Sequence, residues 1–366
     1  MSVADLALQR NKYKHLTDDE WRWFLQQVEG RERTAEKLPT FATIADWWYP
    51  VRLSCEQCSS ELAARYKASL ISNFKFQVSN FADLTGGYGV DTYFISEQFA
   101  HTDYVEQNAE LCRIATHNFA NKPITIHNTS AEEFLNSVGQ YDLIFIDPAR
   151  RDSHGGKVFR LEDCTPNVVE LLPTLLAHGK QLMIKLSPML DLTQAVTSLL
   201  QVCWDIFVVA IKNEVKEVLL LSGGSGKITA IDLTQKDQAF VFTKEEEQNC
   251  QMVNGKCENG KWLYEPNAAI LKAGAYKLIA ERFGLHKLDV NTHLYGSDTL
   301  IENFPGRIWR ITEKQDLKQA NVLCRNYPLT PEQLKKKLHL KDGGTAYVIG
   351  CRVNNKPTLL YGIKPS

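Results

Sequence analysis

The sequence predicts an α/β protein with a mostly parallel sheet, and three observations lead to this fold class. From about residue 78, short apolar runs alternate with amphipathic stretches of helical length, the pattern of parallel strands joined by helices. Residues 204–233 then read as three strands separated by tight turns, without a helix between them, so the sheet is expected to finish in an antiparallel hairpin. Finally, 366 residues exceed one ordinary domain, which predicts additional small domains.

Residues 1–70 are expected to form an N-terminal helical region. Thr17 is a candidate N-cap with Glu20 three residues later, the spacing of a capping box. A second helix is predicted within LSCEQCSSELAARYKASLI, residues 53–71, with Ser54 preceding the helix. The apolar residues of that segment recur at helical spacing, so one face of the helix should be buried.

The parallel sheet is expected within a domain of residues 71–232. Its candidate strands are NFADL, DYVE, ITIH, YDLIFID and QLMIKL, which begin at residues 80, 103, 124, 141 and 181. The helices between them are predicted to begin near Asp91, Asn108, Ala131, Thr165 and Leu190.

The remaining chain is predicted to hold two small domains, residues 233–290 and 291–366. A charged connector, residues 243–260, is followed by one amphipathic helix over residues 264–284. The last part combines short strands with a helix, TPEQLKKKLHL, and reads as an α+β unit. Its candidate strands are GRIWRITE, ANVLCRN, AYVIGCRV and TLLYGI.

Composition indicates the cellular compartment in which the protein is expected. No apolar run approaches the roughly 20 residues of a membrane helix, and the first residues lack the pattern of a signal peptide. Nine cysteines without a regular framework fit a reducing compartment, so a cytoplasmic protein is expected. Cys55 and Cys58 form a single close pair, whereas a structural zinc site needs two such pairs; we predict no metal and expect both cysteines to pack within a helix.

A glycine-rich turn follows the first predicted strand. In ADLTGGYGVDTYF, Gly87 and Gly89 come four and six residues after Asp83, where a sharp turn must approach a ligand without a Cβ. Dinucleotide-binding folds use a similar turn. Here, however, a carboxylate precedes the glycines, and Glu106 ends the second strand, where it can bind ribose hydroxyls. Alternatively, Asp83 only caps the turn and Glu106 is a solvated strand end.

With these features in order, residues 78–232 resemble the class I S-adenosylmethionine-dependent methyltransferases, which have a Rossmann-like sheet. Three further segments, residues 53–68, DPARRD at 147–152 and residues 264–298, are similar to one bacterial methyltransferase family. Members of that family carry a small ferredoxin-like domain and then a THUMP-like domain after the catalytic one. The resemblance covers essentially the whole chain, and its ferredoxin-like domain implies a fold rather than an iron–sulfur cluster.

The resemblance implies S-adenosylmethionine as the methyl donor and a set of residues that bind it. The segment NTSAEEF, after the third strand, would hold the adenine ring. Gln57, Ser59 and Ser60 either cover the methionine end of the donor or serve only as core and capping residues. The predicted donor-binding residues are Asp83, Thr85, Gly87, Gly89, Asp91, Glu106, Gln107, Ser130, Ala131 and Glu132.

The fourth strand ends in Asp147-Pro148-Ala149, which is the candidate catalytic motif. Asp147 would orient or deprotonate the acceptor, Pro148 would stiffen the turn, and Lys185 at the next strand end would assist. Enzymes acting on exocyclic amines add an aromatic residue there, which is missing here; Phe159 in the following loop is a possible substitute. The 5-methyluridine enzymes share an arginine after their proline pair but need a nucleophilic cysteine, where this chain has Ser187. Methylation of a nitrogen or an oxygen is therefore expected.

Basic residues indicate an anionic partner. Arg150 and Arg151 are predicted to bind substrate phosphate, with Lys157 and Arg160 nearby; an internal ion-pair network with neighbouring acidic residues is the alternative. Residues 284–366 hold 13 Lys and Arg against 7 Asp and Glu, although the whole chain carries a net charge of −1. Within this region Lys335 and Lys336 are candidate RNA contacts, unless they are only a solvated helix face.

Three hypotheses for function follow. The first is methylation of a nitrogen or oxygen of structured RNA, tRNA or rRNA, with the basic C-terminal region docking the substrate. The second is methylation of a small molecule or a protein, with that region only closing the site. The third is a non-catalytic RNA-binding scaffold with a methyltransferase fold. The sequence does not indicate an oligomeric state.

Overall fold

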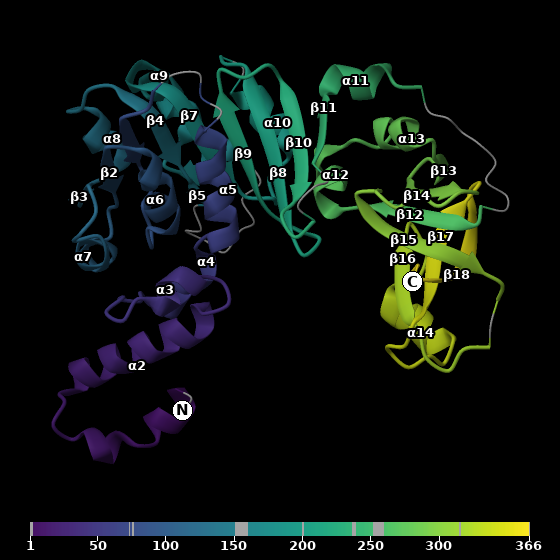
Figure 1. Cartoon of the computed structure of the whole chain (residues 1–366), viewed down its shortest axis with the longest axis horizontal. Coiled ribbons are helices and arrows are strands. Elements are labelled where there is room, and N and C mark those ends of the chain that lie inside the picture. Colours follow the sequence, from purple (N-terminus) through teal and green to yellow (C-terminus); the bar gives the residue numbers. More distant parts are fainter. Residues whose placement is uncertain are drawn as a thin grey trace. The chain divides into compact units, whose positions relative to one another are not determined.

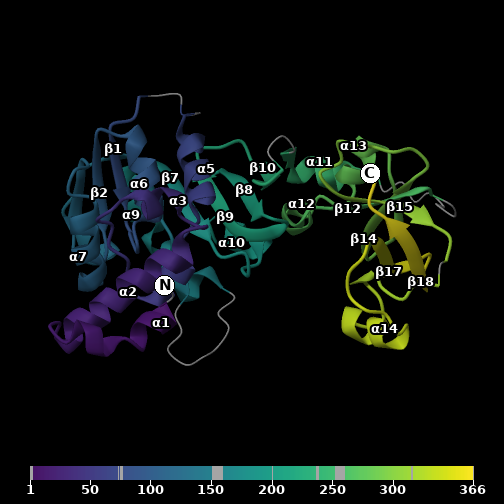
Figure 2. The ribbon, with the colours of Figure 1, turned by 60° about the horizontal axis from the view of Figure 1, so that its bottom comes forward.

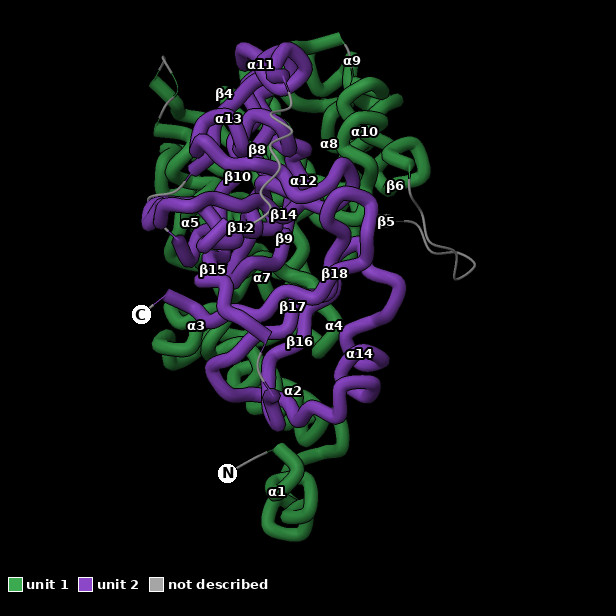
Figure 3. The backbone as a smooth tube through the Cα atoms, turned by 90° about the vertical axis from the view of Figure 1, so that its right-hand side faces the viewer, with its two compact units in different colours: residues 1–204, 219–223 green, residues 205–218, 224–366 purple. Residues whose placement is uncertain are grey.

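The chain forms two compact units in a computed structural model. Unit 1 comprises residues 1–204 and 219–223, and unit 2 comprises residues 205–218 and 224–366, as coloured in Figure 3. No helix of the described chain is long and apolar enough to cross a membrane. The structure describes residues 3–72, 74, 77–150, 160–199, 201–235, 239–251, 260–314 and 316–365, and for Arg150 the backbone alone.

Unit 1 begins with the predicted helical region, whose helix α2 (Asp18–Thr34) lies beyond one end of the unit-1 strands (Figures 1 and 2). The capping box is confirmed, because Thr17 accepts from the Glu20 backbone N–H and Glu20 accepts from that of Thr17. The single helix expected within residues 53–71 is wrong: Cys58 is extended and Ser60 caps a second helix. The elements are α1 (Val3–Ala7), η1 (Arg10–Tyr13), α2 (Asp18–Thr34), α3 (Pro39–Thr43), α4 (Arg52–Gln57) and α5 (Glu61–Ile71).

All five predicted strands of the parallel sheet are present. They are β1 (Asn80–Asp83), β2 (His101–Val105), β3 (Ile124–His127), β4 (Tyr141–Ile146) and β7 (Gly179–Leu186). The connecting helices are α6 (Val90–Ile95), η2 (Ser96–Gln98), α7 (Ala109–Asn118), α8 (Ala131–Leu135), α9 (Val168–His178) and α10 (Leu192–Ser198). In register, Ala82 lies opposite Asp103 on one side and Ile144 on the other, so the carboxyl ends of these strands share one edge. Between β4 and α9 lie the short β5 (Ala149–Arg150), η3 (Leu161–Asp163) and β6 (Cys164–Thr165).

The expected hairpin is present and lies between β7 and the last two strands of the sheet. The strands β8 (Trp204–Ile211) and β9 (Glu214–Ser222) are joined by Lys212 and Asn213, which both have positive φ, the conformation of a two-residue hairpin turn. Next come β10 (Lys227–Asp232), parallel to β8, and the antiparallel β11 (Phe240–Thr243). The full order is β11-β10-β8-β9-β7-β4-β1-β2-β3. Strand β11 was not predicted from the sequence.

A cluster of buried aromatic side chains joins the N-terminal region to the sheet within unit 1. Phe41 packs against Trp47 with ring centroids 4.1 Å apart and ring planes tilted by 31°, and Trp47 Nε1 donates to Tyr88 Oη over 2.8 Å. Tyr88 belongs to the glycine-rich turn, and Phe94 of α6 lies in the same cluster. The N-terminal region therefore packs against the glycine-rich turn through this buried cluster.

The C-terminal part of unit 2 is built on a second sheet, of order β13-β14-β12-β15-β18-β17-β16. Leu263, Leu294, Trp309 and Ile349 are buried in its core. The strands are β12 (Trp262–Pro266), β13 (His286–Asp289), β14 (Thr292–Ser297), β15 (Gly306–Thr312), β16 (Asn321–Arg325), β17 (Ala346–Val353) and β18 (Lys356–Ile363). The helices of this part are α11 (Lys244–Asn249), α12 (Ala268–Ala273), α13 (Leu278–Phe283) and α14 (Pro331–Lys337).

Two expectations for this unit are corrected. The single helix over residues 264–284 is a strand end followed by two helices, because Gly274 adopts a left-handed conformation with φ +84° that ends α12. The charged connector also contains a regular element, α11, which a capping box between Thr243 and Glu246 begins. By contrast, the strands and the helix predicted after residue 306 are all present.

Candidate functional site

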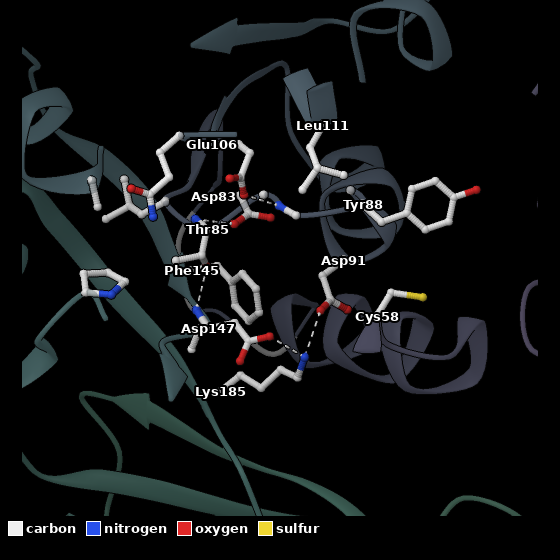
Figure 4. Close-up of a pocket in the computed structure, with 18 of the residues that line it drawn as sticks. Cys58, Asp83, Thr85, Tyr88, Asp91, Glu106, Leu111, Phe145, Asp147 and Lys185 are labelled. Atoms are coloured by element: carbon white, nitrogen blue, oxygen red, sulfur yellow. Dashed lines mark hydrogen bonds and ion pairs between the residues drawn. The ribbon is translucent and has the colours of Figure 1, made fainter. Parts of the chain in front are cut away.

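A cavity of about 350 Å³ lies in unit 1 at the carboxyl ends of β1, β2, β4 and β7 (Figure 4). Ligands of open α/β sheets bind at this edge. The cavity brings together all ten predicted donor-binding residues, together with Asp147 and Lys185. Lining residues that the sequence analysis did not single out include Gly86, Tyr88, Leu111, Phe145 and Pro166.

The glycine-rich turn needs its glycines for two different physical reasons. Gly87 and Gly89 have φ values of +56° and +79°, which side chains rarely tolerate. A Cβ on Gly89 would also lie 2.5 Å from the Phe119 ring, and one on Gly86 would lie 2.1 Å from the Tyr104 ring. Sequence reasoning missed Gly86, because its requirement comes from a side chain on the neighbouring strand.

Glu106 connects the end of β2 to this turn. Its Oε2 accepts from the Gly87 backbone N–H over 2.9 Å, and its Oε1 accepts from the Asn108 N–H over 2.8 Å. The half-buried carboxylate remains part of the cavity wall. Each oxygen has a second lone pair, so Glu106 can still accept hydrogen bonds from a ligand.

Asp83 is more enclosed than Glu106. It accepts from the Thr85 backbone N–H over 3.0 Å and from Thr92 Oγ1 over 2.6 Å, and only 1% of its surface is exposed. Burial raises the pKa of Asp83 to about 7, against the lowering effect of those two hydrogen bonds. Its carboxylate thus fixes the turn internally as well as lining the cavity.

The predicted adenine segment forms the cavity wall beyond Glu106. Ser130 caps α8 by accepting from the Glu133 N–H over 3.2 Å. Ala131 is buried, whereas Glu132 and Gln107 are exposed. This wall therefore combines the polar side chains of Ser130, Glu132 and Gln107 with the apolar side chain of Ala131.

The opposite end of the cavity contains Asp147 and Lys185 (Figure 4). Lys185 Nζ donates to Asp147 Oδ2 over 2.5 Å, and the Asp147 N–H donates to Thr85 Oγ1 over 2.7 Å. The Asp147 side chain is 37% exposed, while Pro148 is buried. The strand end therefore presents one carboxylate, held by an ammonium group, to the cavity.

Behind Lys185 lies a second ion pair. Asp91 accepts from Ser59 Oγ over 2.7 Å and pairs with Lys67 Nζ at 3.1 Å. Burial by itself would raise the pKa of Asp91, but the ammonium groups of Lys67 and Lys185 hold it below its usual value. Lys67 is completely buried in α5. The sequence analysis missed Lys67, although a lysine on the apolar face of a predicted helix is a signal of a buried charge.

The remaining candidates stand as follows. Several candidates lie outside the described part of the chain, namely the side chain of Arg150 and the whole of Arg151, Lys157 and Phe159. In unit 2, Lys335 pairs with Asp342 at 2.5 Å and Lys336 is exposed on α14. The described chain contains no group of three or more His, Cys, Asp and Glu side chains that could hold a metal ion.

Comparison with known proteins gives matches over most of the chain. The crystal structure of a putative methyltransferase from Porphyromonas gingivalis W83 superposes with a TM-score of 0.85 at 30% identity, covering 96% of this chain and 92% of that one. Two relatives from Mycobacterium tuberculosis, strains CDC 1551 and H37Rv, are described as uncharacterized S-adenosylmethionine-dependent methyltransferases. Each is 23% identical over 347 residues, covering 90% of this chain and 92% of the relative.

Two family models match the C-terminal part. A ferredoxin-like domain model matches residues 262–305, and a THUMP domain-like model matches residues 307–362. The two matches together correspond to the second sheet, with β12, β13 and β14 in the first and β15 to β18 in the second.

Proposed function

Because this chain belongs to a family of S-adenosylmethionine-dependent methyltransferases with ferredoxin-like and THUMP-like C-terminal domains, we propose that it methylates a nitrogen or oxygen atom of structured RNA. The observation that carries the proposal is the position of Asp147, a carboxylate that lines the donor cavity, is joined to Lys185 and is partly exposed. A methyl acceptor that binds there would meet the Asp147 carboxylate, which can accept a hydrogen bond from it next to the cavity for the methyl donor.

The volume of the cavity, about 350 Å³, and its polar lining support S-adenosylmethionine as the ligand. Glu106 is proposed to bind the ribose hydroxyls, and the turn of Gly87 and Gly89 to pass close to the donor. Ser130, Ala131, Glu132 and Gln107 are proposed to hold the adenine, with Asp83, Thr85 and Asp91 completing the site. When bound, the donor supplies an electrophilic methyl group on sulfur. The protein contributes alignment, because transfer needs the acceptor, the methyl carbon and the sulfur in line.

Asp147 is proposed to accept the hydrogen bond of the acceptor N–H or O–H, with its carboxylate fixed by Lys185 and its backbone by Thr85. Pro148 restricts the turn that follows. Ser187, after β7, accepts from the Met189 N–H and lacks the nucleophilicity for covalent attack on a pyrimidine carbon. These features support nitrogen or oxygen as the methylated atom.

Two observations support RNA as the partner. The THUMP-like match covers residues 307–362, and the region 284–366 carries six more basic than acidic residues. Exposed Lys336, and Lys335 beside it on α14, are proposed to contact the RNA backbone. Arg150 and Arg151, next to the motif of Asp147, are proposed to bind substrate phosphate.

A labelled-donor assay with total RNA, comparing Asp147→Asn with the wild type, tests the proposal. Asp147→Asn should lower methyl transfer to RNA by about 100-fold or more, while its affinity for S-adenosylhomocysteine in calorimetry stays within a few-fold. Glu106→Ala, in contrast, should weaken the affinity for S-adenosylhomocysteine about 10- to 100-fold.

Glu110→Ala, which removes an exposed carboxylate of α7 paired with Arg113, is the control and should change neither quantity. Label in protein or small molecules instead of RNA would refute the RNA proposal. Full RNA methylation by Asp147→Asn would refute the role of Asp147.

A further inference from the structure

Four side chains of alternating charge extend from the core of unit 1 to the cavity. Lys67 Nζ lies 3.1 Å from Asp91 Oδ1, Asp91 Oδ2 lies 3.8 Å from Lys185 Nζ, and Lys185 Nζ lies 2.5 Å from Asp147 Oδ2. Figure 4 shows the last three of these residues with their two contacts. Lys67 is completely buried, whereas Asp147 is 37% exposed. The row therefore begins in the core and ends where an acceptor would enter.

The distances between these four charged groups indicate which of them the charge of Lys185 affects most. Asp91 has Lys67 closer to it than Lys185, and it also accepts from Ser59 over 2.7 Å. Coulomb attraction falls with distance, so Lys67 is the stronger partner of Asp91. The Lys185 ammonium lies closer to Asp147 than to Asp91, so its charge acts most strongly on Asp147 and on a group bound beside Asp147 in the cavity.

A cation at this place discriminates between two kinds of methyl acceptor. An exocyclic amine attacks as a neutral nitrogen and gains positive charge as its new bond forms, which a nearby ammonium group opposes. A hydroxyl, or a ring N–H next to a carbonyl, loses its proton and brings negative charge to the same place. A fixed ammonium group stabilises that negative charge, and does so most strongly in a site shielded from water.

The aromatic residues of the cavity provide an independent observation. Among the described lining residues the aromatic ones are Tyr88 and Phe145, and both are buried, at 5% and 1% exposure. Tyr88 Oη is also engaged by Trp47. The described part of the cavity thus lacks the exposed aromatic ring that enzymes acting on exocyclic amines place beside this strand end, although a ring would serve any flipped base.

From the row of charges, and resting on the proposed function, we infer that the acceptor of this enzyme reacts as its conjugate base: a ribose hydroxyl or a lactam ring nitrogen of RNA, and not an exocyclic amine. The acceptor proton moves to the Asp147 carboxylate, and the electron pair of that O–H or N–H bond stays on the acceptor atom. That atom then bonds to the methyl carbon, while the carbon–sulfur bond breaks with its electron pair going to the sulfonium sulfur. Lys185 balances the negative charge of the acceptor, and Asp147 returns its proton to solvent.

The inference is tested by identifying the methylated atom. Total RNA from cells lacking the gene is incubated with full-length protein and isotopically labelled donor, digested to nucleosides and analysed by mass spectrometry. Label in 2′-O-methylnucleosides, or in N1-methylguanosine or N3-methyluridine, supports the inference, and resistance of the adjoining phosphodiester to alkali identifies the ribose product. Label in N6-methyladenosine, N4-methylcytidine or N2-methylguanosine would overturn it, while the RNA proposal would stand.

Other outcomes separate the two proposals. If a cell extract accepts the label in protein or small molecules only, the RNA proposal fails. The inference is then decided by the labelled atom: an oxygen or an amide-type nitrogen supports it, and an amine overturns it. Absence of label from every pool would count against both proposals.

Variants of Lys185 provide a second measurement on the same substrate. Lys185→Met should lower turnover by about 100- to 1,000-fold, the typical effect of removing one stabilising donor, with affinity for S-adenosylhomocysteine within about three-fold of wild type. Lys185→Arg keeps the positive charge and should recover part of that loss. Wild-type turnover in a folded Lys185→Met protein would overturn the inference.

Discussion

Asp83 combines burial with a carboxylate, and this has a consequence for stability. An aspartate has an ordinary pKa of 3.8, whereas burial raises the pKa of Asp83 in the folded protein to about 7. Between these two pH values the folded chain binds a proton that the unfolded chain does not. Stability associated with this proton is complete below pH 4 and is lost as pH rises through 7, by about 4 kcal/mol in total.

We therefore predict that Asp83→Asn, which cannot ionise, becomes more stable relative to wild type as pH rises from 4 to 8. The measurement is the free energy of unfolding in urea for both proteins at each pH. Because both contain the other titrating groups, their difference isolates Asp83 and the carboxylates that interact with it. The loss of one hydrogen bond to the turn adds a constant offset. A difference that does not change with pH would contradict the prediction.

At the scale of single elements, the turn between β1 and α6 depends on glycine. Gly89 is the N-cap of α6 with φ +79°, and the Phe119 ring would lie 2.5 Å from an added Cβ. Gly89→Ala should lower the free energy of unfolding by roughly 2–5 kcal/mol, from backbone strain together with displacement of Phe119. It should also weaken binding of S-adenosylhomocysteine, because the turn lines the cavity.

Gly139→Ala is the matched control for this turn. A Cβ on Gly139 would meet nothing within 4 Å, so this change should stay within about 0.5 kcal/mol of wild type. Chemical denaturation and calorimetry of the two variants side by side provide the comparison. Equal stability and equal affinity in both would show that the turn tolerates a side chain.

At the scale of the whole molecule, charge is unevenly distributed along the chain. Residues 284–366 hold 13 basic and 7 acidic side chains, and the rest of the chain holds 29 and 36. If the basic region contacts RNA, replacing Lys336 and its exposed neighbour on α14, Lys337, by glutamine should weaken RNA binding at low salt. The slope of log Kd against log salt should also become flatter by about 1 to 2, because fewer counterions are released.

The control for this prediction makes the same change of charge in unit 1, at the exposed Lys12 and Lys14. Binding of total tRNA across a salt series is the measurement. The control should keep the wild-type slope. Equal losses in both double variants would indicate a general effect of net charge, and would remove Lys336 and Lys337 as specific contacts.

Local sequence patterns were enough to predict the strands of the parallel sheet, the glycine-rich turn and the Asp147 motif, and the family resemblance added the class of methyl donor. These features are visible because they are local: strand periodicity, a turn that needs glycine and a carboxylate at a strand end all fall within a few consecutive residues. The strands and the helix of the last part were predicted from their own local patterns, whereas its THUMP-like character was inferred from the resemblance to a bacterial methyltransferase family. The domain boundaries and the roles of the site residues stay predictions.

Only the tertiary structure decided the features that depend on distant residues. Gly86 is required because of Tyr104 on the next strand, and Lys67 of α5 reaches Asp91 in α6 to leave Lys185 beside Asp147. The break between α4 and α5 and the strands β11, β13 and β14 likewise went unpredicted, since short segments gain their stability mainly from tertiary packing. A buried charge is likewise favourable only beside its partner, and a sequence does not show which residues the fold will bring together.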